Sequence, residues 1–133
     1  MTETPSAPAP DGQLATRNMT MPADANSFGN VFGGWVMSQM DIAGSVAAVE
    51  HINNYVVTVA VDSMVFVAPI HIGDVVSCYT KIVKTGRTSI TVHVETWALH
   101  RLKGGLREKV TEADFTYVSV DENGRPTPIQ KGA

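Results

Sequence analysis

GNVFGGWVMSQMDIAGSVAA, residues 29–48, is the stretch of this sequence that decides the fold. It opens with a glycine-rich turn and continues as the one segment with a convincing helical character. The pattern predicts a helix from about Gly33 to His51, closed by Asn53 and Asn54, with a length of about 26 Å at the usual rise per residue. Because most of its side chains are apolar, this helix must be covered by the sheet that the rest of the chain forms.

One carboxylate, Asp41, interrupts the apolar sequence of the predicted helix. Such a group lies on the surface, is hydrogen-bonded within the structure, or serves a function, because burial without a partner costs free energy. The helix contains no Lys or Arg, so Asp41 does not belong to a charged, solvated face. Since its neighbours at helical spacing are small or weakly polar, we expect a face that another backbone or a ligand can approach closely. These neighbours are Gly34, Met37, Ser38, Gly44, Ser45 and Ala48.

The remainder of the chain is predicted to form strands, because it is dense in β-branched residues and is divided by Pro and Gly turns. Short turns between consecutive strands favour antiparallel pairing. The expected fold is therefore α+β, with the order β-α-β-β-β-β and a five-stranded antiparallel sheet wrapped around one long helix. Both faces of residues 55–67 are largely apolar, so we expect the second face to meet another subunit. The predicted strands are residues 14–21, 55–67, 75–84, 87–99 and 107–120.

Length and composition indicate a single globular domain. A chain of 133 residues with 44% hydrophobic and 17% charged residues is large enough to bury a core. The net charge of -3 argues against nucleic acid as a partner, because phosphate binding needs a basic surface. We expect a domain over residues 13–122, with a disordered tail at 1–12 and a polar tail at 123–133.

Cys78 is the only cysteine, which excludes an intrachain disulfide and a cluster of thiolate metal ligands. It falls within a predicted strand, where a buried, inert thiol is expected. The first residues contain no basic region followed by an apolar run, so no signal peptide is predicted, and no segment is apolar enough to span a bilayer. We expect a cytoplasmic protein with no membrane partner.

The backbone N–H groups of Gly33 and Gly34 are expected at the helix N-terminus, where they can polarise a carbonyl or hold an oxyanion. A tight turn that needs glycine is the alternative explanation for this pair. Asn26, in the loop before the helix, is either a turn residue or an amide that contacts a substrate. Together, a carboxylate base at Asp41, an amide and free N–H groups favour hydrolysis of an activated acyl group.

Gly33 and Asp41 are separated by eight positions of one helix, which corresponds to about 12 Å. A single thioester carbonyl cannot lie within hydrogen-bond reach of both residues. If both act, they must therefore come from different subunits whose helices pack side by side.

Residues 85–89 read TGRTS, in which a glycine turn brings Arg, Thr and Ser together at the start of a strand. These groups can bind phosphate, although a plain β-turn explains the pattern equally well. The spacing does not match the phosphate loop of nucleotide hydrolases. The four histidines are scattered over the helix end, a turn and strands, so no metal site is predicted. They are His51, His71, His93 and His100.

Several runs of the sequence carry a family resemblance. The most specific is GNVFGGWVMSQMD at residues 29–41, and the others are ADAN at 23–26, VTVAVD at 57–62, GDV at 73–75 and GRTS at 86–89. Over about residues 14–120, the chain resembles the hot-dog-fold acyl-CoA thioesterases, and among them the YciA-type bacterial acyl-CoA hydrolases. The resemblance implies a hot-dog fold, hydrolysis of coenzyme A thioesters, and homodimers that assemble into a hexamer as a trimer of dimers.

The resemblance also implies roles for individual residues. Asp41 matches the catalytic carboxylate, Asn26 matches the amide of the loop, and Gly33 or Gly34 matches the backbone donor at the helix start. Many relatives have His at the position of Phe32, so the backbone N–H must suffice here if that His holds the carbonyl. The positions expected to contact the acyl-CoA substrate are Val59, Val61, Gly86, Arg87, Thr88 and Ser89.

No cofactor is expected, because coenzyme A is part of the substrate and of the product. Two other function classes stay open. A hot-dog module can bind acyl-CoA without hydrolysing it, and Asp41 favours the enzyme over this module. A hot-dog dehydratase needs a catalytic His on the helix or its entry loop, and residues 23–41 contain none.

Overall fold

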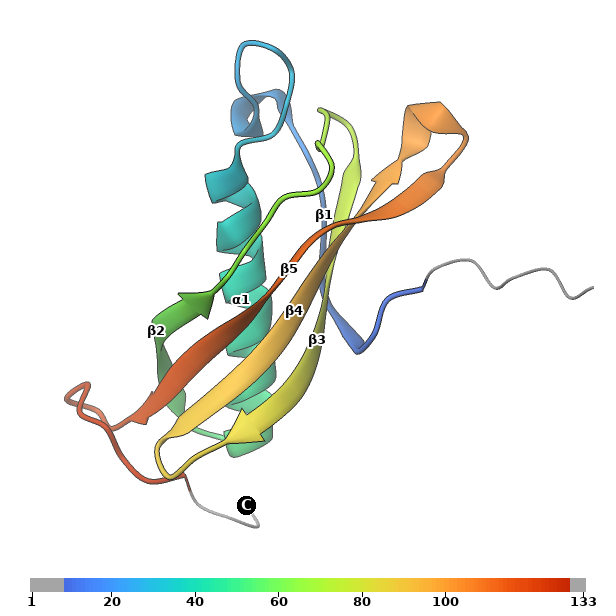
Figure 1. Ribbon diagram of the computed structural model, residues 1–133. Helices are drawn as coiled ribbons and strands as arrows, with labels where there is room; N and C mark the ends of the chain where they lie inside the picture. The colour runs from blue at the N-terminus through green and yellow to red at the C-terminus, as the bar shows by residue number, and fades with distance from the viewer. Residues whose placement is uncertain (1–8, 130–133) are drawn as a thin grey trace, which may run out of the picture.

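A computed structural model describes residues 9–129, in which a curved sheet wraps around one long helix (Figure 1). The helix, α1, spans Gly33–Ile52. Two short 3-10 turns, η1 and η2, occupy Pro22–Asp24 and Arg101–Lys103. The strands are β1 (Gln13–Met19), β2 (Tyr55–Asp62), β3 (Val75–Thr85), β4 (Ser89–His100) and β5 (Leu106–Val120).

The five strands form one antiparallel sheet in the order β1-β3-β4-β5-β2. The predicted α+β class, the element order and the single long helix are thereby confirmed. β1 and β2 are the two edges of the sheet, and α1 lies against its concave face (Figure 1). Within residues 9–129, neither α1 nor a shorter helix combines the length and the apolar character needed to cross a membrane.

The core lies between α1 and the inner face of the sheet. α1 contributes Val36, Met40 and Ala43, which are at most 1% exposed. Burial of each large apolar side chain contributes about 1.5–3 kcal/mol. Cys78 is also fully buried, and its burial raises the pKa of the thiol, which keeps it protonated. The apolar residues that the strands contribute to this core include Val76, Ile90, Val92, Val94, Ala113, Phe115 and Tyr117.

The predicted strand at residues 55–67 is wrong in its second half. β2 ends at Asp62, because Ser63 has a φ of 33°, in the left-handed region, and turns the chain out of the extended conformation. The chain still follows β5 after this turn, since the hydroxyl of Thr111 donates to the carbonyl of Val65 at 2.7 Å. The other predicted strands and the helix agree with the structure to within two residues at each end.

The predicted tails lie partly outside the described residues, which leave out 1–8 and 130–133. The described part of the C-terminal segment packs on the domain. Ile129 donates its N–H to the carbonyl of Arg87, in the turn between β3 and β4, at 2.8 Å. Part of the segment that the sequence suggested as a polar tail is therefore tied to the sheet.

β2 is an edge strand with an apolar surface. Its side chains Tyr55, Val57, Val59 and Val61 are between 39% and 69% exposed. An open edge with apolar side chains is a surface on which another chain can pair and pack. This exposure agrees with the expectation that the second face of this strand meets another subunit.

The close approach of α1 to the sheet at Gly44 depends on the absence of a side chain. A Cβ added there would lie 2.3 Å from Oη of Tyr117. Gly44 and Ala48 are buried in the core of their own chain. The small residues beside Asp41 therefore do not all form a face for another backbone or a ligand, which corrects the sequence-based expectation. Gly34 is exposed, and a Cβ added to it meets no atom within 4 Å.

We predict that Gly44→Ala lowers the free energy of unfolding by about 1–3 kcal/mol, because the added methyl group displaces the Tyr117 side chain. Urea denaturation at equal protein concentrations measures the change. Gly34→Ala is the matched control, and we expect it to be neutral or to stabilise by up to about 1 kcal/mol through helix propensity. Equal stabilities of the two variants would show that Tyr117 does not restrict position 44.

Candidate functional site

Asp41 lies half-buried near the middle of α1, where two hydroxyl groups hold one oxygen of its carboxylate. Thr58 of β2 donates to Oδ1 at 2.7 Å. Tyr117 of β5 lies 3.1 Å from the same oxygen and 2.9 Å from the backbone carbonyl of Asp41. Among residues 9–129, no side chain or backbone group donates to Oδ2. One carboxylate oxygen is therefore fixed, and the other is left for water or a substrate.

Tyr117 is suited to act as a permanent donor to Asp41. Its side chain is fully buried, and burial is the main reason why its pKa is raised far above the usual value. The negative charge of Asp41 and the hydrogen bond to it raise the pKa further. The phenol therefore stays protonated over the whole range in which a hydrolase operates.

Thr58 and Tyr117 were not predicted as site residues. They are directly opposite each other in the register of β2 and β5, so that two neighbouring strands present hydroxyl groups to the same carboxylate. No local pattern in the sequence signals this pairing, because it depends on strands that are distant in the chain. Knowledge of the strand register alone would have pointed to them.

The N-terminus of α1 presents free backbone donors, as predicted. The N-cap residue, Phe32, makes no capping hydrogen bond with its side chain. Its carbonyl accepts the N–H groups of Trp35 and Val36, at 3.1 and 3.3 Å. The N–H groups of Gly33 and Gly34 bond to no group within residues 9–129, so they are available to an oxyanion or a carbonyl.

A pocket of about 250 Å³ opens beside these donors. It is lined by Gly33 and by mostly apolar side chains from α1, from the segment after β2 and from β5. The ring of Phe66 forms one wall, 3.5 Å from the position that a Cβ on Gly33 would occupy. An apolar pocket next to polar donors can receive a small apolar chain attached to a carbonyl. Its lining includes Val31, Val36, Pro69, Ile70 and Val110.

Asn26 stabilises the loop that leads into α1. Its Oδ1 accepts the backbone N–H groups of Phe28, at 2.9 Å, and of Asn30, at 3.1 Å. The side-chain oxygen of Asn26 therefore has the role of a turn residue, which was one of the two explanations for this position. Its Nδ2 group donates to no described residue and stays available to a ligand.

The predicted coenzyme A turn lies at the other end of the molecule. Gly86 donates to the carbonyl of Ser89 at 2.8 Å and closes the hairpin between β3 and β4. Arg87 is exposed, and Thr88 is half-buried. This turn lies near the C-terminal end of α1, whereas the Asn26 loop lies beyond its N-terminal end (Figure 1).

Within one chain, the candidate residues are not assembled into a single site. Asp41 and Gly33 both lie on α1, so their separation of eight residues still corresponds to about 12 Å. Val59 and Val61 are exposed on the outer edge of the sheet, at 54% and 39%. A pocket of about 590 Å³ between β1, β3 and the C-terminal half of α1 contains none of the predicted site residues.

Comparison with known proteins identifies the family. The model of the thioesterase superfamily matches residues 28–104. The acyl-CoA thioester hydrolase YciA of Salmonella typhimurium is 48% identical over 122 residues, which cover 90% of this chain and 92% of that protein. YciA of Escherichia coli K12 is 47% identical over the same shares of the two chains.

Solved structures show the same relationship. The hexameric thioesterase y2039 of Yersinia pestis has a TM-score of 0.88 at 48% identity, covering 93% of this chain and 100% of that chain. Cj0915 of Campylobacter jejuni, described as a hexameric hot-dog-fold thioesterase, has a TM-score of 0.84 at 44% identity, covering 90% of this chain and 92% of that chain. The predicted hot-dog fold is confirmed. The chain belongs to the thioesterase superfamily, in its group of hot-dog-fold acyl-CoA thioesterases of the YciA type.

Proposed function

We propose that this protein hydrolyses acyl-CoA to a free carboxylic acid and coenzyme A, with Asp41 as its catalytic base. The observation that carries this proposal is the Asp41 carboxylate, which is held at Oδ1 by two hydroxyl groups and is open at Oδ2. The likeness to the YciA acyl-CoA thioester hydrolases, at 47–48% identity, supports the choice of substrate.

In the proposed reaction, Oδ2 of Asp41 removes a proton from a water molecule as the water oxygen forms a bond to the thioester carbon. The carbonyl π electrons move to oxygen and then return as the carbon–sulfur bond breaks. Asp41 gives the proton to the departing sulfur, so coenzyme A leaves as a thiol. Thr58 and Tyr117 keep the carboxylate in one orientation during both proton transfers.

The oxyanion needs donors that are in place before the reaction begins. The N–H groups of Gly33 and Gly34 meet this need, because they are exposed at the helix N-terminus, where the helix dipole favours negative charge. The free Nδ2 group of Asn26 serves as a further donor to the carbonyl or to the attacking water. The apolar pocket beside Gly33 takes the first carbon atoms of the acyl chain.

We further propose that each active site is shared by two subunits of a homodimer. The separation of about 12 Å between Asp41 and Gly33 supports this arrangement, because one carbonyl cannot reach both residues of a single chain. The proposed coenzyme A turn at 86–89 and the Asn26 loop lie at opposite ends of α1, which also supports a site built from two chains. The open edge of β2, with Val59 and Val61, supplies the contact surface. The hexameric relatives support a trimer of such dimers.

The base assignment predicts that Asp41→Asn lowers kcat by about 10² or more, the usual range for loss of a general base. The side chain keeps its shape, so folding and oligomeric state should not change. Release of free thiol from butyryl-CoA measures the rate. Glu50→Gln, which removes an exposed carboxylate from the same helix, is the control and should keep full activity. Near-normal kcat in a correctly assembled Asp41→Asn protein would end the assignment, and no thiol release from the wild type would favour an acyl-CoA-binding module.

If Arg87 in the turn at 86–89 binds a phosphate of coenzyme A, Arg87→Ala should raise KM for acyl-CoA and change kcat much less. The reason is that a phosphate contact stabilises the ground state and the transition state alike. An acyl-pantetheine, which lacks the nucleotide, should be hydrolysed equally well by variant and wild type. Arg101→Ala removes an exposed arginine from the opposite end of β4 and should leave both parameters unchanged. If Arg87→Ala weakens the pantetheine substrate to the same extent, Arg87 does not bind a phosphate.

The shared site predicts that two inactive variants restore activity when they are mixed. Asp41→Asn removes the base, and Gly33→Pro removes an N–H at the first helical position, where proline is tolerated. In a mixed dimer, one site receives both changes and the other receives neither. The isolated mixed dimer should therefore show about half of wild-type activity, and an unsorted random mixture about a quarter. Gly34→Pro replaces Gly33→Pro if the latter fails to fold.

For the measurement, the two variants are co-expressed with different tags and the mixed species is isolated. Its hydrolase activity is then compared with that of each parent variant. Absence of recovery with both glycine variants, in confirmed mixed dimers, would mean that each subunit carries a complete site or that the donor is not at Gly33 or Gly34.

A further inference from the structure

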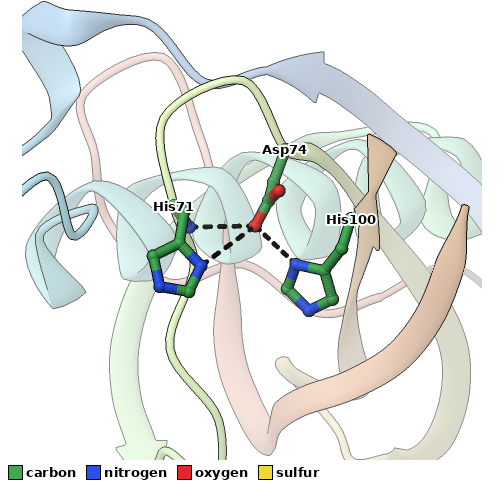
Figure 2. A group of neighbouring side chains, drawn as sticks. All are labelled: His71, Asp74 and His100. Atoms are coloured by element: carbon green, nitrogen blue, oxygen red, sulfur yellow. Dashed lines mark hydrogen bonds and ion pairs between the residues drawn. The ribbon is translucent and has the colours of Figure 1, made fainter. Parts of the chain in front are cut away.

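Two histidines converge on one carboxylate outside the proposed active site (Figure 2). His71 lies in the loop between β2 and β3, Asp74 directly precedes β3, and His100 ends β4. Nδ1 of His100 lies 2.7 Å from Oδ2 of Asp74, and Nδ1 of His71 lies 3.8 Å from the same oxygen. Each of the three residues offers a ligand atom within 4.8 Å of the other two. The sequence did not predict this group, because the two histidines meet only in the folded chain.

The ring of His100 is held in one orientation. Its side chain is 4% exposed, and its Nε2 lies 2.6 Å from Oε1 of Glu108 on β5. This contact holds the ring so that Nδ1 faces Asp74. A carboxylate on the far nitrogen is the usual partner of a metal-binding histidine, because it fixes both the ring and its tautomer.

The group can hold a small cation once the contact between Asp74 and His100 opens. A tetrahedral ion with bonds of about 2.0–2.2 Å to nitrogen and oxygen keeps its ligand atoms about 3.3–3.5 Å apart. The two separations here, 2.7 and 3.8 Å, lie on either side of that value. The His71 ring is too far from Asp74 for a hydrogen bond, so it faces the carboxylate without bonding to it. The backbone N–H of His71 donates to the same oxygen at 2.9 Å and keeps the loop in this position.

We propose that His71, Asp74 and His100 bind a divalent transition-metal ion of the zinc class, with water as the fourth ligand. Two imidazole nitrogens and one carboxylate suit Zn²⁺ and its neighbours Co²⁺ and Ni²⁺. On binding, the proton between His100 and Asp74 passes to solvent, and these two side chains separate to admit the ion. The side chain of His71 is 44% exposed, which gives the ion and the water ligand a path from solvent.

A second group, His93, Glu95 and Glu112, offers ligand atoms within the same distance but is less suitable. Glu95 and Glu112, which supply its oxygen ligands, are both bound to residues outside the group. His93 lies 2.6 Å from Asp114, and Glu95 accepts the indole N–H of Trp97 at 2.8 Å. An ion there would compete with Trp97 and Lys109 for the two carboxylates. Within residues 9–129, the Asp74 carboxylate is bound only by the two histidines of its own group.

Metal at the His71 group would strengthen the attachment of the loop that carries Asn26. The N–H of Ile72 donates to the carbonyl of Gly29 at 3.3 Å, and Asn30 forms an antiparallel bridge with His71. The two loops are therefore joined by their backbones next to the ligands. A bound ion holds one of them to the end of β4, so we expect it to raise the thermal unfolding temperature.

Titration of tag-free, EDTA-treated protein with Co²⁺ tests the site, because Co²⁺ with four ligands has strong visible absorption bands. We expect these bands to saturate at one ion per chain and to disappear when Zn²⁺ is added. Zn²⁺ alone should raise the unfolding temperature increasingly with its free concentration. A wild-type protein that shows neither the bands nor the stabilisation would overturn the proposal.

Substitutions locate the ion. His71→Gln should abolish the bands and the stabilisation by Zn²⁺, and it should leave the metal-free fold intact because the side chain is half-exposed. His51→Gln, at an exposed position on α1, is the matched control and should bind Co²⁺ like the wild type. His93→Gln should also bind normally. Bands that persist in His71→Gln, or that are lost in His93→Gln instead, would assign the ion elsewhere and contradict the proposal.

Discussion

The double contact from the Tyr117 hydroxyl to Asp41 is the interaction on which the packing of helix and sheet depends. It joins α1 to β5 and reaches both the backbone carbonyl and the carboxylate of the same residue. A buried phenol needs a hydrogen-bond partner, and Gly44 leaves the room in which Tyr117 finds one. This contact therefore links the attachment of α1 to β5 with the orientation of the candidate catalytic group. Thr58, on the neighbouring strand β2, donates a further hydrogen bond to the same carboxylate.

The helix and the antiparallel pairing of the strands could be predicted from the sequence, and Asp41 could be singled out as a candidate, because each depends on a local pattern. An apolar run with glycines before it identifies a helix, and a lone carboxylate in that run is visible without a structure. The end of β2 could not be predicted, since the backbone turn at Ser63 follows a run that is still rich in apolar residues. The roles of Thr58 and Tyr117 depend on the register of two distant strands, which no short pattern encodes.

For the candidate site, too, the sequence identified individual residues but not how they are arranged in space. Asn26, Gly33 and Arg87 were named from motifs, and the structure shows free donor groups on Asn26 and Gly33 and an exposed Arg87. The sequence does not say how these groups come together, because their distances depend on the fold and, in our proposal, on a second chain. The apolar edge at β2 gives that second chain a physical reason to bind, since burial of exposed apolar surface is favourable.

The position of β2 in the sheet also matters for the chain while it is being made. Within the described residues, β2 is hydrogen-bonded only to β5, the last strand to leave the ribosome. The backbone N–H and C=O groups of β2 therefore lack their strand partner until translation of the domain is nearly complete. An unpaired apolar strand invites aggregation, so a chain that stops before β5 is not a smaller folded domain.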